Sequence, residues 1–402
     1  MADHTTKLDK LLRLALASAR IAIDRLRRRK IVMLHLAIAG QIQYLAPLVA
    51  ALRSAKANIA FYLAKEGNWE FSHPNELGIP PERVLEGPVY SHARGIDVFI
   101  TSTQFTDRPP NTQRICIFHG QPSKGNTFLP ENMQLFDQLF LLGPLQHSLY
   151  DEFAAQYPSI AKNIRTLNVG YPKSDALLRG QFRRETVLSD LGLVPAKPTI
   201  LFAPAYDKGT ALDIYGESLI ETLMQCDVNV LVKLHPMQYD PEAIKSFSGG
   251  INWPERLRTY AQHTNFRLLG NQPIDPLLAA SDVMLTDISG VAFEFMMLDR
   301  PVIFIDCPKF FKEVAPSATY RTSSERVQQD IRCNAGRSAG LVVRSLVDLP
   351  AAIQRSLANP SEFSQQRKEL ADQLLYNPGR AATAAANAVL ELLGLPDRVP
   401  ND

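Results

Sequence analysis

The sequence predicts an α/β protein built from two Rossmann-like domains, and three observations support this prediction. Short apolar runs alternate with helical patterns along the chain, as in parallel sheets that are covered by helices. Several of these runs are apolar on both faces, which is typical of buried parallel strands. The runs form two series of similar length that meet near residues 180–198. Because ligands bind beyond the carboxyl ends of such strands, we expect the functional residues there.

The composition allows two full hydrophobic cores and restricts the class of partner. The chain has 402 residues, of which 46% are hydrophobic, and its 43 basic and 41 acidic residues nearly balance. No overall field attracts nucleic acid, so we expect no nucleic-acid partner and a local site for any anion. The four cysteines lie far apart without a CxxC pair, which indicates a reducing, cytoplasmic compartment.

Residues 1–30 are predicted to contain a basic amphipathic helix, over residues 7–30. Its apolar face is formed by Leu8, Leu11, Leu12, Ala15 and Leu16, and its basic residues gather near the C-terminal end, where they suit the helix dipole. Two interpretations stay open. The helix is either an arm on an acidic membrane surface or a solvated helix packed on the first domain.

The uncharged stretch 31–52 has two possible interpretations. Its length and the basic residues before it are compatible with a membrane span. However, it contains His35, Gln41, Gln43 and Pro47, and a glycine at its middle. These residues favour a buried strand, a glycine turn and an amphipathic helix.

The remaining elements divide the chain into a first domain at 31–185, a second at 196–375 and a terminal helix at 376–402 that can cross back to the first domain. The strands expected in the first domain are IVMLHLAIA, NIAFYLA, DVFITST, ICIFHG and QLFLLG, with helices QYLAPLVAALRSA and PLQHSLYDEFAAQY. The second domain has expected strands PTILFAPA, VNVLVKLHP, NFRLLG, DVMLTD and PVIFID, with helices SLIETLMQC and VAFEFMMLD. The segment RAATAAANAVLELLG is the terminal helix.

The first candidate site follows the strand ICIF. His119 should lie at the carboxyl end of that strand, where an imidazole can accept a proton from an attacking hydroxyl. Gly120 lets the backbone approach a ligand, and Gln121, Ser123 and Lys124 add hydrogen-bond donors. The alternative is a histidine that only holds a loop.

The second candidate site closes the strand VNVLVKLHP. Pro236 ends the strand, so His235 should point beyond it, with Lys233 just before. A donor at this position can hold a phosphate oxygen as charge builds on a leaving group. A structural histidine at a strand end is the alternative.

The third candidate site is a strand–turn–helix at Thr286, Asp287, Ser289 and Gly290. The start of a helix offers free N–H groups to a phosphate. Capping by Asp287 or Ser289 is an equally simple function and is compatible with anion binding. Glu294, one turn later, either reaches a ribose or lies on the surface.

The loop 170–175 contributes the secondary candidates Lys173 and Asp175, in addition to Lys124. No DxD-type acidic pair is placed for a divalent ion, so we assign no metal ligand and leave metal dependence open.

Together these segments resemble the CDP-glycerol glycerophosphotransferase family, which comprises the teichoic-acid-type polyglycerolphosphate transferases. The matching segments are HG at 119–120, GYPKSDALL at 170–178, LFAPAYD at 201–207, KLHP at 233–236, SDVMLTDISGVAFEFMMLDRPVIFID at 281–306 and NPGRAATAAANAVLELL at 377–393. The chain departs from the family at Ile288, Gly290 and Glu294, where the family often has an aromatic residue, a second serine and an aspartate.

The resemblance implies a GT-B architecture with the active site in the cleft between two Rossmann-like domains. An acceptor hydroxyl would attack the glycerol-bearing phosphorus of CDP-glycerol and release CMP, with CDP-glycerol as substrate and no cofactor. His119 would match the base. His235, Thr286, Ser289 and Gly290 would match the family's contacts with the donor diphosphate, and Glu294 a contact with the ribose. We therefore predict His119 and His235 as the catalytic residues, and we add Gly120, Lys233 and Asp287 to the predicted donor-binding residues.

The implied setting is the synthesis of a cell-surface polymer. The acceptor would be a polymer or a lipid-linked molecule, and the protein would work in the cytoplasm, at the inner face of the plasma membrane. All of this requires the two imidazoles to face the positive end of one helix across a shared cleft.

Two other functions fit the same residues. A GT-B glycosyltransferase that uses a nucleotide-sugar donor needs the same phosphate-holding turn. A non-catalytic nucleotide-binding partner in a polymer-assembly complex would need the turn but not the base.

Overall fold

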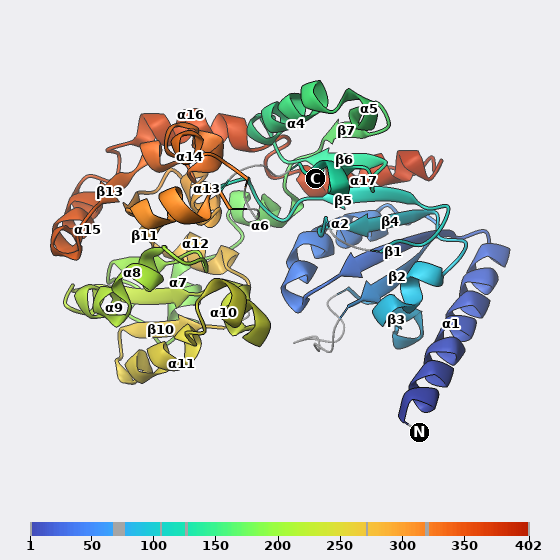
Figure 1. Cartoon of the computed structure of the whole chain (residues 1–402), viewed down its shortest axis with the longest axis horizontal. Coiled ribbons are helices and arrows are strands. Elements are labelled where there is room, and N and C mark those ends of the chain that lie inside the picture. Colours follow the sequence, from blue (N-terminus) through green and yellow to red (C-terminus); the bar gives the residue numbers. More distant parts are fainter. Residues whose placement is uncertain are drawn as a thin grey trace. The chain divides into compact units, whose positions relative to one another are not determined.

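A computed structural model describes residues 2–66, 77–104, 107–124, 128–270, 272–317 and 321–400 (Figure 1). The chain divides into two compact units. Unit 1 comprises Met1–His119, Phe128–Asp175 and Leu375–Asp402, and unit 2 comprises Gly120–Thr127 and Ala176–Leu374.

Unit 1 is built on a seven-stranded sheet in the order β3-β2-β1-β4-β5-β6-β7, and every neighbouring pair is parallel. The strands are β1 (Lys30–Leu36), β2 (Ile59–Lys65), β3 (Val84–Glu86), β4 (Val98–Thr101), β5 (Gln113–Ile117), β6 (Gln138–Leu141) and β7 (Arg165–Asn168). The helices of unit 1 are α1 (Ala2–Leu26), α2 (Ile42–Ser54), α3 (Pro130–Met133), α4 (Pro144–Gln156), α5 (Pro158–Ala161) and α17 (Ala381–Leu392).

The alternation of side chains along β1 assigns a different helix to each face of this sheet. Val32 and Leu34 belong to the core that includes apolar residues of α2 and α17. Ile31 and Met33 point to the opposite face and pack in the cluster that includes residues of α1. Both faces are therefore covered, which explains why the strand reads as a continuous apolar run.

Helix α1 packs on unit 1 through a different face from the one expected. Ala17 and Ile21 are buried, and the carboxylate of Asp24 accepts hydrogen bonds from Tyr62 and Arg83. The predicted face was wrong at Leu12 and Leu16, which are 58% and 62% exposed. The side chains of Leu8 and Leu11 lie outside the described residues.

The stretch 31–52 forms the buried strand β1, a short 3-10 turn at Ala39–Gln41 and helix α2, as predicted. Within the described part of the chain, no helix combines the length and apolar character that a bilayer crossing needs. The polar residues of the stretch serve the fold: the side chain of Gln41 accepts from the N–H of Ala37 at 2.7 Å and donates to Thr103 at 2.8 Å.

Unit 2 repeats the plan with a six-stranded parallel sheet in the order β10-β9-β8-β11-β12-β13. The strands are β8 (Thr199–Phe202), β9 (Asn229–Lys233), β10 (Phe266–Leu269), β11 (Val283–Thr286), β12 (Val302–Ile305) and β13 (Leu341–Val343). The helices are α6 (Asp175–Leu178), which begins on the last residue of unit 1, α7 (Arg184–Asp190), α8 (Ala211–Tyr215), α9 (Glu217–Met224), α10 (Pro241–Phe247), α11 (Trp253–Leu257), α12 (Asp275–Ala280), α13 (Val291–Met296), α14 (Ser324–Gln329), α15 (Leu349–Ala358) and α16 (Ser364–Leu374).

Both sheets have the strand order of doubly wound α/β folds, so each has a point where the order reverses. In unit 1 the reversal lies between β1 and β4, and in unit 2 it lies between β8 and β11. Ligands of such sheets bind beyond the carboxyl ends of the strands at this point. The predicted α/β architecture of two Rossmann-like halves is confirmed.

Candidate functional site

In unit 1, His119 lies two residues beyond the end of β5, next to the end of β4. Its Nδ1 is 3.1 Å from the backbone carbonyl of Ser102. A carbonyl can only accept, so Nδ1 carries the proton and the neutral ring leaves Nε2 as an acceptor. The side chain is exposed. Although the residue as a whole is exposed, loss of hydration at the ring lowers the pKa of the imidazole, and the hydrogen bond to Ser102 opposes that shift in part.

Two tyrosines support this histidine. The hydroxyl of Tyr171 donates to the carbonyl of His119 at 2.8 Å, and the ring of Tyr44 lies 6.0 Å from the imidazole. The two tyrosine rings stack at 6.2 Å. Both ends of the His119 residue are therefore held, the imidazole by Ser102 and the backbone by Tyr171.

The loop 170–175 makes structural contacts within unit 1. Asp175 accepts from the N–H groups of Ala381 at 3.0 Å and Ala382 at 2.8 Å, so its carboxylate caps α17. Lys173 is buried, with its ammonium 5.6 Å from the ring centre of Tyr171. These two secondary candidates hold the segment that supports His119.

In unit 2, His235 follows β9 and has the opposite hydrogen bonding from His119. Its Nδ1 accepts from the N–H of Met237 at 3.2 Å, because Pro236 turns the chain back over the ring. The neutral ring therefore carries its proton on Nε2 and acts as a donor there. The ring of Tyr206 lies 4.4 Å away.

Lys124 is held next to this pair of rings. Its ammonium forms an ion pair with Asp207 at 2.5 Å and lies 4.7 Å from the ring centre of Tyr206. Burial acts to lower the pKa of Lys124, but the negative charges of Asp207 and Asp287 outweigh it and the pKa is raised. The ammonium is therefore a positive charge beside Tyr206, whose ring in turn lies next to His235.

Asp287 and Thr286 hold the turn at the strand-order reversal. Asp287 accepts from the N–H groups of Ala205 at 2.8 Å, Ile288 at 2.6 Å and Ala211 at 3.0 Å. Burial raises the pKa of this carboxyl against the effect of those amides. The hydroxyl of Thr286 donates to the carbonyl of Ala203 at 2.7 Å. These contacts give both residues a positioning function.

The helix after this turn is shorter than predicted. The expected helix VAFEFMMLD ends at Met296, so α13 has six residues and only a small dipole. The backbone passes into α13 through Ser289 and Gly290, and Gly290 lies close to Gln121 and Ser123. Glu294 is 8% exposed, so the surface alternative is wrong.

Lys233 also has a structural contact. It is buried, and its ammonium donates to the carbonyl of Gly270 at the end of β10. Among the described residues, no three His, Cys, Asp or Glu side chains gather as metal ligands.

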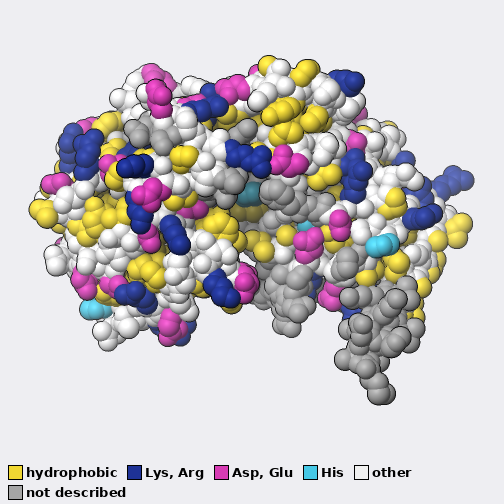
Figure 2. Space-filling view, viewed as in Figure 1, with side chains coloured by type: hydrophobic (Ala, Val, Ile, Leu, Met, Phe, Trp, Pro, Cys, Tyr) yellow, Lys and Arg dark blue, Asp and Glu magenta, His cyan; other side chains and the backbone are white. Residues whose placement is uncertain are grey.

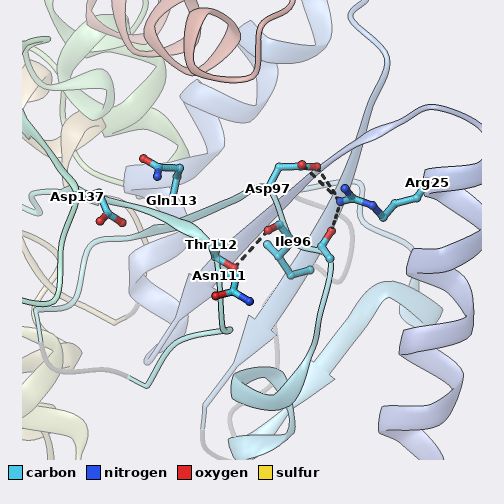
Figure 3. A pocket seen from close by; sticks show the side chains of 8 residues that line it. Arg25, Ile96, Asp97, Asn111, Thr112, Gln113 and Asp137 are labelled. Carbon is cyan, nitrogen blue, oxygen red and sulfur yellow. Dashed lines mark hydrogen bonds and ion pairs between the residues drawn. The ribbon is translucent and has the colours of Figure 1, made fainter.

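A cavity of about 480 Å³ opens at the amino ends of β4 and β5 in the sheet of unit 1 (Figure 3). His119 lies at the other ends of these strands, the carboxyl ends. Its polar groups bond to one another: Arg25 donates to the carbonyl of Gly95 at 2.6 Å and pairs with Asp97 at 3.4 Å. None of the predicted site residues lines it. We assign the site to the carboxyl edges, where ligands of parallel sheets bind.

Three residues with functional contacts were missed as site residues, although the first two lie within the quoted LFAPAYD segment. They are Tyr206, Asp207 and Ser102. Tyr206 and Asp207 could have been found by their position, because they lie beyond the end of a predicted strand. The same kind of position pointed to the two histidines and to the turn at 286–290. Ser102 acts through its backbone carbonyl, so its residue type carries no signal.

Comparisons with known proteins support the resemblance. The family model for CDP-Glycerol:Poly(glycerophosphate) glycerophosphotransferase matches residues 140–308. The teichoic acid glycerol-phosphate primase of Bacillus subtilis (strain 168) is 29% identical over 36% of this chain and 34% of its own length. Its counterpart from Bacillus spizizenii is 26% identical over 34% of this chain and 33% of its own length. The alignments thus span about a third of each curated relative.

Solved structures share the fold over nearly the whole chain. The wall teichoic acid polymerase TagF is 15% identical and has a TM-score of 0.65, with 98% of this chain and 97% of that chain covered. A putative UDP-N-acetylglucosamine 2-epimerase from Listeria monocytogenes is 16% identical, with a TM-score of 0.54 over 93% of this chain and 99% of its own. The fold is therefore GT-B-like, and residues 140–308 are similar to the CDP-glycerol glycerophosphotransferase family, the family that the motifs resemble.

Proposed function

We propose that the protein transfers glycerol phosphate from CDP-glycerol to an acceptor hydroxyl in the synthesis of a cell-surface polymer. The observation that carries the proposal is the opposite hydrogen bonding of two imidazoles at strand ends. Nε2 of His119 is an acceptor, and Nε2 of His235 is a donor. A transfer to an alcohol needs one group that takes a proton and another that holds negative charge.

The proposed step follows from these assignments. The acceptor hydroxyl gives its proton to Nε2 of His119 while its oxygen forms a bond to the glycerol-bearing phosphorus. The bond from that phosphorus to the bridging oxygen breaks, and CMP leaves with the electron pair. His235 and Lys124 stabilise the charge on the phosphate oxygens, which is the main task of the protein in phosphoryl transfer.

Unit 2 is the proposed donor-binding unit, and unit 1 supplies the base. The family-model match over residues 140–308 and the primase similarity support CDP-glycerol as the donor. Glu294 is buried, and in this proposal its carboxylate contacts the ribose of the donor. The fixed turn at 286–290 would hold the diphosphate through Ser289 and Gly290, with Asp287 and Thr286 behind it. No cofactor is part of the proposal, and a divalent ion stays open.

We also propose that the protein works in the cytoplasm at a membrane surface, through the outer face of α1. Four apolar side chains on this face are exposed: Leu12 (58%), Leu16 (62%), Ile23 (41%) and Leu26 (84%). Figure 2 shows apolar and basic side chains near one another along this part of unit 1. An exposed apolar stripe that ends in the basic run 27–30 suits a bilayer with anionic lipids.

Vesicle sedimentation tests this contact without damaging the core. Deleting residues 1–30 would remove the buried Ala17 and Ile21, so Leu16→Gln with Leu26→Gln is the sharper change. We expect the intact protein to sediment with phosphatidylglycerol vesicles and the double variant to stay in solution. Equal sedimentation of the two proteins would contradict the proposal.

The transfer is tested by incubating the protein with CDP-glycerol or a panel of nucleotide-sugars. Acceptors are polyprenyl-phosphate-linked sugars and glycerol-phosphate oligomers, and the readouts are the released nucleotide and the product mass. We expect CMP from CDP-glycerol and an acceptor heavier by one glycerol phosphate. Nucleotide release only from a sugar donor would indicate a glycosyltransferase, and binding of CDP-glycerol without turnover would indicate a binding partner.

A further inference from the structure

Two contacts within unit 2 bear on the orientation of the His235 ring. The first is the hydrogen bond that its Nδ1 accepts from the N–H of Met237 at 3.2 Å. One hydrogen bond fixes one ring atom but lets the ring plane rotate about that bond. The second contact is the ring of Tyr206, whose centre lies 4.4 Å from that of the imidazole, with 32° between the two planes. This ring restricts the rotation, so the direction of the Nε2–H group depends on Tyr206.

Tyr206 lies at the place in unit 2 where a ligand of the sheet is expected. It follows β8 by four residues, and His235 follows the neighbouring strand β9 by two. Strand β8 also borders the reversal of strand order. Because the carboxyl ends of parallel strands meet at one edge, the tyrosine is part of the same edge as the histidine that it contacts.

Tyr206 is itself held by several neighbours in unit 2. Phe247 of α10 meets its ring edge-on at 5.4 Å. The ammonium of Lys124 lies 4.7 Å from the ring centre and is kept there by the ion pair with Asp207. The hydroxyl of Ser248 donates to the backbone carbonyl of Tyr206 at 3.1 Å. The tyrosine ring therefore cannot move away from the imidazole without the loss of several contacts.

We propose that Tyr206 is a positioning residue that acts through His235, because its ring keeps the Nε2–H group directed at the phosphate oxygens of the donor. The proposal rests on the transfer reaction proposed above. A donor that is oriented before the reaction stabilises the developing charge without any cost of reorganisation. An imidazole that rotates offers its N–H group in the right direction for only part of the time, so the rate falls.

The first test compares two substitutions of the tyrosine, with kcat for CMP release at saturating CDP-glycerol as the readout. Tyr206→Phe keeps the ring, and its kcat should stay close to that of the wild type. Tyr206→Leu fills the space without a ring and should lower kcat about tenfold, less than the loss expected from removal of the His235 donor itself. In a His235→Ala background, Tyr206→Leu should cause no further loss, because no imidazole is left to position.

Two further variants separate positioning from a general loosening of unit 2. Tyr260 is the matched control, because its ring lies 6.4 Å from that of His263 before the amino end of β10. Tyr260→Leu should leave kcat unchanged, and an equal loss in Tyr260→Leu and Tyr206→Leu would overturn the proposal. Phe247→Leu removes a support of the Tyr206 ring and should give a smaller loss than Tyr206→Leu, in the same direction.

The proton on the His235 ring supplies a readout that does not depend on activity. NMR spectra of protein labelled with ¹⁵N at its eight histidines distinguish the two neutral forms of the ring, and His235→Ala assigns the signal. The Nε2–H form should dominate in the wild type and in Tyr206→Phe, and both forms should be present in Tyr206→Leu.

The outcomes separate this proposal from the transfer function. An unchanged kcat in Tyr206→Leu would overturn it, and so would an equal loss with and without the imidazole of His235, because Tyr206 would then act on another group. If the wild type releases no CMP, the transfer function fails, while the NMR spectra still decide whether Tyr206 holds the imidazole.

Discussion

His119 and His235 show how one residue type takes two chemical functions in two similar sheets. Each histidine follows a parallel strand, one in each unit. In unit 1 the first partner of the ring is a carbonyl oxygen, which places the proton on Nδ1 and leaves Nε2 as an acceptor. In unit 2 the first partner of the ring is a backbone N–H, which donates to Nδ1 and leaves the proton of the neutral ring on Nε2. The backbone beside the strand, and not the histidine itself, therefore decides between base and donor.

The largest expected effect comes from removing the acceptor nitrogen of unit 1. His119→Ala and His119→Gln should each lower the rate of CMP release by about 10²–10⁴-fold, because neither side chain can take the acceptor's proton. Calorimetry with CDP-glycerol should show unchanged binding. A His119→Gln enzyme with near wild-type rate would remove the assignment of His119 as base.

The donor histidine should respond differently to the same pair of changes. His235→Ala should lower the rate by about 10²–10³-fold, the usual cost of losing one charge-stabilising donor. His235→Gln should recover part of that loss, since its amide still donates. Equal rates for the Ala and Gln variants would show that the two imidazoles do not differ as their hydrogen bonds indicate.

Two carboxylates make a second comparison between the units, with stability as the readout. Asp287→Ala should lower the free energy of unfolding by about 3 kcal/mol or more, because three backbone amides lose their acceptor and each buried unpaired group costs about 1–3 kcal/mol. Asp175→Ala removes the cap of α17 and should cost about 0.5–2 kcal/mol. Urea denaturation measures both, and the reverse order would contradict this account of the turn.

The smallest effect is the pH dependence of the rate. The lowered pKa of His119 keeps its Nε2 unprotonated at neutral pH. The rate should therefore stay level as the pH falls from 8 to about 6.5, the usual histidine pKa, and should decrease only in more acidic solution, where the ring takes up a proton. Rate profiles at saturating CDP-glycerol test this, and a decrease that begins above the usual histidine pKa would contradict it.

The sequence was sufficient to predict most of the strands, the two α/β halves and the two histidines at strand ends, but it did not indicate the three-residue strands β3 and β13. These features depend on local patterns: apolar runs, a proline after a strand and a polar residue directly beyond it. The cleft between the units, in which both imidazoles were expected to face one helix, stays a prediction.

The contacts made by the site residues could not be predicted, because they join segments far apart in the chain. Asp287 accepts hydrogen bonds from the backbone amides of residues 205 and 211, and Lys124 forms an ion pair with Asp207. The exposed Leu12 shows the same limit, because helical spacing defines an apolar stripe but not which stripe the sheet will cover.

Unit 1 is formed by segments that lie before and after most of unit 2 in the sequence, and this affects the order of folding during synthesis. Ala385 and Val389 of α17 complete the core beneath β1, and Gly170 (φ +100°) packs so closely against Tyr376 that a Cβ would lie 2.0 Å from its carbonyl oxygen. The ribosome makes these late segments only after the whole of unit 2. Until then α2 covers this face of the nascent first sheet only in part, and the apolar surface that stays exposed makes the sheet prone to aggregation during that interval.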